Sequence, residues 1–183
     1  MNRKRIFYGV LALLIAGLAW YGVLHWRSRP PKPNVPIAVF GSQQTLNAFL
    51  SASDVTAERL HYRRASRQNP WRLDSYDRDA SFPVSAEQAH TIQQLFAQES
   101  SYGWQFAKMC APTYGVLLTA RSNQSTVRVA LCFECYILGV YDSADDTAKP
   151  VNRENDFVSP ASRSLVSLVK QLFPNDPEIQ SLK

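Results

Sequence analysis

Histidine and cysteine are scarce in this sequence, with three of each in 183 residues. The short motifs of several common enzyme classes are also missing: GxSxG, HExxH, the P-loop and the glycine pattern of a Rossmann fold. No histidine stands near a serine or cysteine in a catalytic arrangement. An enzyme is therefore less expected than a binding protein, and the sequence predicts neither a cofactor nor a metal ion.

Acidic residues are absent from the first 32 positions, which carry six basic side chains. The rest of the chain has 14 basic and 15 acidic side chains, so its net charge is −1 although the whole chain carries +5. A nucleic-acid-binding protein usually has a basic patch or stripe on its globular part. The nearly neutral remainder therefore argues against nucleic acid as a partner.

A long apolar run occurs only near the N-terminus. Residues 6–26 hold about 21 residues without a charged side chain, which is long enough for a helix to cross the hydrocarbon core of a bilayer. We expect a basic tail at 1–5, a transmembrane signal-anchor helix at 6–26 and a proline-rich linker at 27–36. The alternative is a signal peptide cleaved after Gly17-Leu18-Ala19, which would give a secreted protein.

Residues 37–183 are expected to form a single α+β domain of two layers, an antiparallel sheet covered by two or three helices. Ser85 and Gln88 form an S-x-x-Q capping box that predicts a helix ending at about Glu99. Ser42 and Ser159 are expected to begin two other helices. Three predicted strands cover Val55–Arg63, Tyr114–Arg121 and Thr126–Phe133, the last two joined as a hairpin.

The most apolar stretch of this domain is Val127–Tyr141, VRVALCFECYILGVY. Its large residues alternate up to Phe133 and then shift by one position from Tyr136 onward, which indicates a β-bulge or a tight turn between these two residues. In a regular strand Cys132 and Cys135 would be about 10 Å apart on opposite faces. An interruption is therefore needed before both sulfur atoms can face the same side.

Three short segments resemble a set of small bacterial proteins, exported or membrane-anchored, to which no activity is assigned. The segments are the C-x-P of Cys110–Pro112, the LCFxC of Leu131–Cys135 and the Phe173-Pro174 pair. The resemblance covers about residues 82–174. It brings no catalytic residue with it, and it implies a bacterial source with the exported side in the periplasm.

The three cysteines, Cys110, Cys132 and Cys135, are the first candidate site. In an oxidising compartment they allow three pairings, each leaving one thiol unpaired. A structural disulfide that uses Cys110 is one interpretation, and three reduced, buried thiols are another. A metal site would need a histidine as its fourth ligand, for which the spacing gives no support. Redox catalysis is disfavoured because the CxxC lies in a strand, whereas thioredoxin-like motifs open a helix.

The second candidate is a basic cluster of five residues. Three of them lie in the first predicted strand and two come shortly after it. Its members are Arg59, His61, Arg63, Arg64 and Arg67. Alternation would place the first three on one strand face, where they could contact anionic lipid headgroups or an acidic partner. The simpler interpretation is a solvated edge strand whose charges prevent aggregation. Glu134, between two cysteines, is either a buried carboxylate or the outward residue of the bulge.

Together these features predict a membrane-anchored extracytoplasmic domain that acts by binding or scaffolding. We expect a single pass through the inner membrane, with the domain in the periplasm and a protein as the possible partner. The alternative is a thiol-redox or metal-binding protein that uses Cys110, Cys132 and Cys135.

Overall fold

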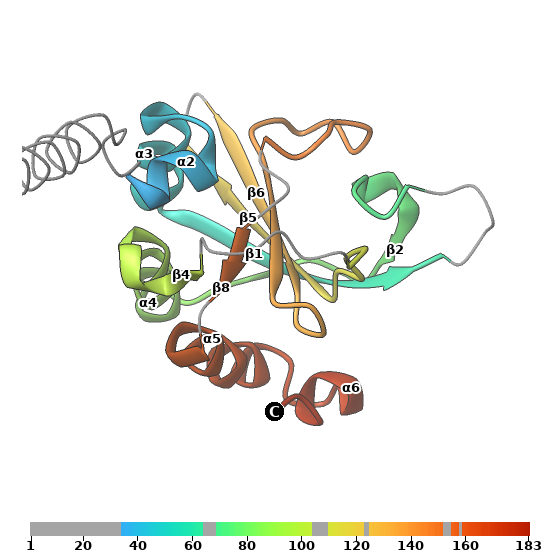
Figure 1. Ribbon diagram of the computed structural model, residues 1–183. Coiled ribbons are helices and arrows are strands. Elements are labelled where there is room, and N and C mark those ends of the chain that lie inside the picture. Colours follow the sequence, from blue (N-terminus) through green and yellow to red (C-terminus); the bar gives the residue numbers. More distant parts are fainter. Residues whose placement is uncertain (1–33, 64–68, 104–109, 123–124, 152–154, 158) are drawn as a thin grey trace, which may run out of the picture. The chain divides into compact units, whose positions relative to one another are not determined.

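The computed structural model describes residues 34–63, 69–103, 110–122, 125–151, 155–157 and 159–183. This described part is an α+β domain with eight strands in one antiparallel sheet and five α-helices (Figure 1). The predicted α+β class with an antiparallel sheet is thus confirmed, although the described residues form more helices than the two or three that were expected. The strands are β1 (Asp54–Tyr62), β2 (Tyr76–Arg78), β3 (Phe82–Pro83), β4 (Tyr102–Gly103), β5 (Val116–Arg121), β6 (Thr126–Cys132), β7 (Ile137–Tyr141) and β8 (Asn155–Phe157).

The strands follow the order β2-β1-β5-β6-β7-β8-β4, and β3 pairs with β1 beside β2. Strand β1 therefore has neighbours on both sides, and its prediction as an edge strand is wrong. The hairpin β5–β6 is confirmed, with Leu118 opposite Val129. Its connection is closed by a hydrogen bond from the Ser122 amide to the Ser125 carbonyl (2.9 Å).

The stretch Val127–Tyr141 is two strands joined by a four-residue turn. Strands β6 and β7 pair with Cys132 opposite Ile137, and residues 133–136 connect them. Tyr136 has φ 52°, in the left-handed region, which is common at the last position of such turns. Of the two interpretations of the shifted apolar pattern, the tight turn is confirmed and the bulge is wrong.

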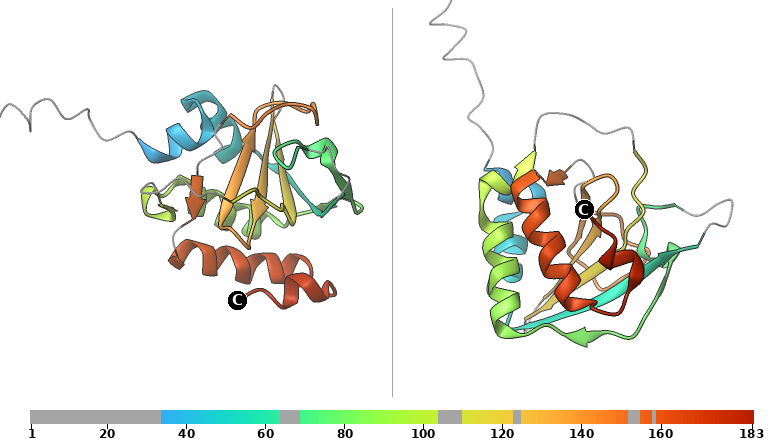
Figure 2. Two further views of the ribbon diagram at one scale, coloured as in Figure 1. Left: turned by 45° about the vertical axis from the view of Figure 1, so that its right-hand side comes forward. Right: turned by 90° about the horizontal axis from the view of Figure 1, so that it is seen from below.

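Helices cover one face of the sheet (Figures 1 and 2). Alternate strand residues such as Val116, Leu118 and Val129 point into this layer and are fully buried. The rings of Phe40, Phe49 and Phe96 join three of the helices, with centroids 5.2–6.0 Å apart. The helices are α2 (Val35–Phe40), α3 (Gln43–Leu50), α4 (Ala86–Ala97), α5 (Ser159–Leu172) and α6 (Pro177–Gln180).

The cap predictions hold at two of the three helices. Ser42 caps α3, and Ser85 and Gln88 form the expected capping box of α4. Ser159 is instead the first residue of α5. Helix α6, which the sequence analysis did not predict, begins at Pro177 after an Asp176 cap whose side chain accepts from the Ile179 amide (2.9 Å).

The opposite face of the sheet carries a smaller apolar cluster under loops and the short 3₁₀ helix η1 (Leu73–Ser75). This cluster is rich in tyrosine and contains all three cysteines at its centre or margin. Its buried members are Leu60, Leu73, Tyr76, Tyr114, Leu117, Ala130, Cys132, Ile137 and Tyr141. We call this side the loop-covered face and the other the helix-covered face.

The N-terminal predictions lie mostly outside the described residues. The tail at 1–5, the span at 6–26 and linker residues 27–33 are among these, whereas Val35 and Pro36, predicted as linker, are part of α2. Among the helices that the structure describes, none has the length and apolar character to cross a membrane.

Candidate functional site

A groove lies where β1 ends and β5 begins. It consists of two adjoining hollows of about 490 and 510 Å³ that share His61 and Glu178. One wall is the C-terminal segment around α6, and the other is formed by residues 113–115 and the β6–β7 turn. The larger hollow is lined by Arg59, Leu60, His61, Tyr62, Thr113, Tyr114, Gly115, Phe133, Glu134, Glu178, Ile179, Ser181 and Leu182.

Arg59 forms the base of this groove. Its side chain is only 7% exposed, and its Nε lies 2.7 Å from an Asp176 carboxylate oxygen while Nη2 pairs with Glu178. Nη1 donates to the carbonyl oxygens of Leu60 (2.8 Å) and Gly115 (2.7 Å). A Cβ atom at Gly115 would lie 3.2 Å from Nη1, so glycine leaves room for the guanidinium. Arg59 thus fastens the C-terminal segment to the sheet.

The electrostatics of Asp176 follow from this arrangement. Partial burial alone would raise its pKa, but hydrogen bonds from the Ile179 amide and from Arg59 outweigh burial and hold the pKa below its usual value. The charge of Arg59 is therefore compensated within the protein. The prediction that Arg59 belongs to an exposed basic surface is therefore wrong, because its side chain is buried.

Of the other members of the predicted basic cluster, the two that the structure describes each lie beside an acidic side chain. His61 Nε2 lies 3.3 Å from Asp79 at the groove, with the two side chains 47% and 61% exposed. Arg63 Nε lies 3.4 Å from Asp77, and its guanidinium also contacts the Asp74 carbonyl. Arg64 and Arg67 lie outside the described residues.

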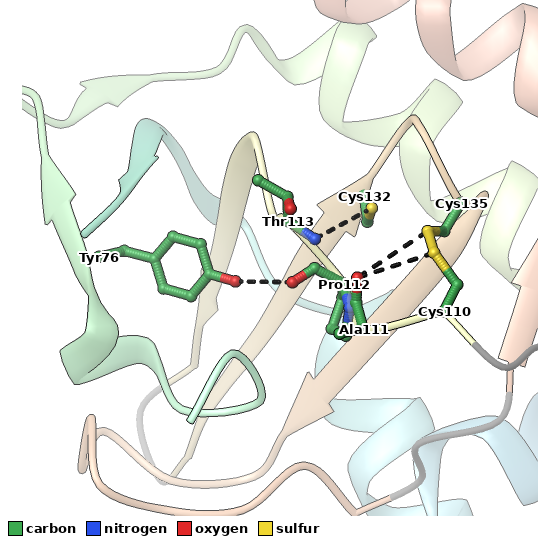
Figure 3. Close-up of a disulfide and its surroundings, with 7 residues drawn as sticks. All are labelled: Tyr76, Cys110, Ala111, Pro112, Thr113, Cys132 and Cys135. Atoms are coloured by element: carbon green, nitrogen blue, oxygen red, sulfur yellow. Dashed lines mark hydrogen bonds between the residues drawn. A yellow bond between two sulfur atoms is a disulfide. The ribbon is translucent and has the colours of Figure 1, made fainter. Parts of the chain in front are cut away.

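A disulfide joins Cys110 to Cys135 (Figure 3), and residues close to them in sequence, Thr113 and Glu134, line the groove. The predicted disulfide that uses Cys110 is confirmed, and the Cα atoms are 6.5 Å apart. Cys132 is free and buried. With two sulfurs in a disulfide, the metal site of three cysteines and a histidine does not form, and the described residues contain no group of three or more potential ligands.

Two tyrosines hold residues 110–114 against the loop-covered face. Tyr76 Oη shares its one proton between the carbonyl oxygens of Pro70 (2.8 Å) and Pro112 (3.2 Å), and it accepts from the Tyr114 amide (3.3 Å). Burial raises the pKa of both phenols, so they stay neutral. A Cβ at Gly139 would lie 2.4 Å from the Tyr114 hydroxyl. The Tyr114 ring therefore requires glycine at this position.

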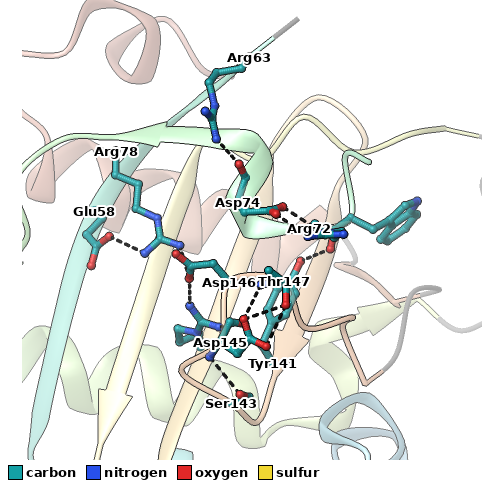
Figure 4. A network of polar contacts seen from close by, with 12 residues as sticks. Glu58, Arg63, Arg72, Asp74, Arg78, Tyr141, Ser143, Asp145, Asp146 and Thr147 are labelled. Carbon is teal, nitrogen blue, oxygen red and sulfur yellow. Dashed lines mark hydrogen bonds and ion pairs between the residues drawn. The ribbon is translucent and has the colours of Figure 1, made fainter. Parts of the chain in front are cut away.

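A second polar network lies farther along the same face (Figure 4). Arg128 is buried and pairs with Asp146, which also lies 2.6 Å from Arg78, and Arg78 in turn lies 3.5 Å from Glu58. Partial burial opposes ionisation of Asp146, but hydrogen bonds from Arg128 and Arg78 lower its pKa. The sequence signals this network only through Arg128, a lone cation in the apolar run Val127–Tyr141.

The described histidines have polar partners of their own. The two histidines that the structure describes, His61 and His90, hydrogen-bond Asp79 and Gln94. In this described part neither is paired with a serine, threonine or cysteine, as a nucleophile and its base would be. Glu134, the subject of two interpretations above, is exposed in the turn. The groove therefore offers aromatic and charged contacts on a fixed frame.

No protein-family profile, curated protein or solved structure matches this chain. The resemblance to small bacterial exported proteins stays a prediction. The geometry of the groove and of the contacts around it is therefore the basis for a functional proposal.

Proposed function

We propose that this protein is a membrane-anchored binding module whose extracytoplasmic domain contacts its partner through the groove. The observation that carries the proposal is the groove itself, a concave surface with exposed His61, Glu134 and Glu178 beside partly buried Tyr62 and Phe133. Binding sites of this kind combine apolar and aromatic area with a few charged groups that orient the ligand.

The frame around the groove supports binding because it is fixed before any ligand arrives. Arg59 fastens one wall through two carboxylates, and the Cys110–Cys135 disulfide joins the two parts of the other wall, the segment that begins at Cys110 and the β6–β7 turn. A preorganised surface loses less conformational entropy on binding, so more of the contact energy contributes to affinity.

The proposed compartment has two supports. A disulfide persists in an oxidising environment such as the periplasm, and the uncharged run at 6–26 has the length of a signal anchor. The short basic tail before that run favours a cytoplasmic N-terminus, which places the domain on the exported side.

In-cell photo-crosslinking of the full chain tests the binding proposal. A photoreactive amino acid placed at Glu134 or Ser181 reports on the groove, and the same residue at the exposed positions Glu87 and Gln94 of α4 provides the matched control. We expect crosslinks to the partner from the two groove positions and none from the two control positions. Equal crosslinking at all four positions, or none from the groove, would contradict the proposal.

Topology is tested separately with a reporter fused after Lys183. A reporter that is active only outside the cytoplasm should give signal, and one that is active only in the cytosol should not. The opposite pattern would overturn the proposed compartment without bearing on the groove.

A further inference from the structure

Three sulfur atoms gather around one short stretch of backbone, residues 111–113 (Figure 3). The Ala111 carbonyl oxygen lies 3.7 Å from the Cys110 sulfur and 3.9 Å from the Cys135 sulfur. Two residues later, the Thr113 amide donates to the Cys132 sulfur at 3.3 Å. The free thiol and the disulfide are thus held next to the same three residues.

The β6–β7 turn also allows Cys132 and Cys135 to meet each other. Cys132 ends β6, Cys135 is the third of the four turn residues, and the turn closes with Tyr136 in the left-handed region. Loops of this length are most often built around a type I turn, whose first and fourth Cα atoms lie within about 7 Å. That spacing also satisfies a disulfide.

We propose that the Cys110–Cys135 disulfide exchanges with the Cys132 thiol and acts as a switch for the groove. The Cys132 thiolate attacks the Cys135 sulfur, a Cys132–Cys135 bond forms and the Cys110–Cys135 bond breaks. Cys110 leaves as a thiolate and takes up the proton that Cys132 lost, so no external oxidant or reductant is consumed.

The exchange changes the groove because the cysteines flank its wall. Thr113 and Tyr114 line the groove from the segment that begins at Cys110, and Phe133 and Glu134 line it from the turn. The present disulfide ties these two parts together, whereas a Cys132–Cys135 bond closes only within the turn and releases Cys110. This switch goes beyond the proposed binding function, since it concerns bond connectivity whatever the partner is.

The accessibility of the sulfurs suits such a step. Cys110 and Cys135 are partly exposed, and Cys132 is 3% exposed. Solvent thiols can therefore reach the disulfide more readily than the buried thiol. An exchange that starts at Cys132 is intramolecular, and it needs only that the turn and residues 110–113 move against each other.

Disulfide mapping of the full chain in mild detergent tests the proposal. The protein is incubated without added thiol at mildly alkaline pH, alkylated under acid quench and cleaved with chymotrypsin, which separates Cys132 from Cys135 after Phe133. We expect a gain of Cys132–Cys135 peptide together with alkylated Cys110. Absence of that peptide, or its replacement by a Cys110–Cys132 bridge, would overturn the proposal.

Two variants sharpen the test. Cys132→Ser should keep the Cys110–Cys135 bridge and abolish any alkylation of Cys110. Cys110→Ser should form the Cys132–Cys135 bridge on air oxidation, and two alkylatable thiols in that variant would by themselves overturn the proposal. Crosslinking from the groove positions is measured independently, so loss of partner binding and absence of exchange are distinguishable results.

Discussion

The two faces of the sheet differ in what covers them and in the side chains beneath. The helix-covered face is packed with aliphatic residues and three phenylalanine rings under α2, α3, α4 and α5. The loop-covered face holds tyrosines, cysteines and buried ionic groups such as Arg128 and Glu58. Burial of apolar side chains, which has no preferred direction, stabilises the helix-covered face. Hydrogen bonds, ion pairs and a disulfide, which depend on direction, stabilise the loop-covered face.

The difference between the faces indicates which part of the domain can offer specific contacts to a partner. Close-packed aliphatic side chains under helices tolerate many volume-conserving exchanges and offer nothing specific to a partner. Polar contacts fix the loops in one arrangement, because a buried polar group without its partner is costly. The three cysteines lie on the loop-covered face. The groove has residues from both sides, because Tyr62 and Tyr114 belong to the loop-covered face and Ile179 of the α6 wall packs on the helix-covered face. Four substitutions test the comparison.

The largest effect is expected from Leu118→Ala on the helix-covered face. Leu118 is fully buried among helices that cannot easily collapse into the space it leaves, so the free energy of unfolding should fall by about 4–5 kcal/mol. Leu117→Ala is the matched control, because this neighbour is equally buried but faces the loops. There we expect about 2–3 kcal/mol. Urea unfolding of the full chain measures both, and equal losses would break the comparison.

Loss of the disulfide ranks second. Cys110→Ser opens a loop with a sequence separation of 25 residues, and the loop-entropy relation gives a loss of about 3.5 kcal/mol. Cys132→Ala keeps the disulfide and should cost less than about 1.5 kcal/mol. Melting under non-reducing conditions compares the two variants. A Cys110→Ser protein as stable as the wild type would show that the disulfide does not secure the loop-covered face.

Removal of the Arg59 side-chain charge ranks third. Arg59→Met leaves Asp176 and Glu178 without their cation, and we expect a loss of about 2–3 kcal/mol. Arg63→Met is the control, since Arg63 is 43% exposed in its pair with Asp77 and should cost less than about 1 kcal/mol. If denaturant titrations gave the same loss of unfolding free energy for both variants, the buried ion pairs of Arg59 would contribute no more to stability than an exposed pair.

The smallest effect is a pH dependence. The pKa of Asp176 is lowered in the folded protein, so its contribution to stability is present above the unfolded value of about 3.9 and is lost as pH falls through the lower folded pKa. Asp176→Asn should therefore destabilise the protein at neutral pH and flatten the loss of stability below about pH 4. An unchanged acid profile in that variant would assign the acid sensitivity to other carboxylates, Asp146 first.

Several elements were predictable because their causes are local. The capping box at Ser85 and Gln88 is contained in four consecutive residues, and the β5–β6 hairpin follows from alternation on both sides of a polar turn. The helix that this box predicts buries Ala89, Ile92 and Phe96, whereas Leu95 is only half-buried. Its truncation should thus cost less than the 2–5 kcal/mol typical of a fully buried leucine.

The site was less predictable because its residues come from distant parts of the chain. Arg59 looked like one cation of a surface cluster, and its carboxylate partners are 117 and 119 residues away. The short helix α6, which brings those carboxylates to Arg59, had a local signal in Asp176-Pro177 that could have been used. Nothing near Arg128 in sequence indicated Asp146 as its partner.

The α+β class, the caps of α3 and α4 and the interruption after Phe133 follow from the sequence alone, because periodicity and capping act over a few residues. The contrast in charge between the first 32 residues and the nearly neutral remainder can also be read from it. Three features could be seen only in the three-dimensional structure: the pairing of Cys110 with Cys135, the burial of Arg59 and the groove beside α6. Those outcomes depend on contacts between segments whose approach is set by the packing of the whole sheet.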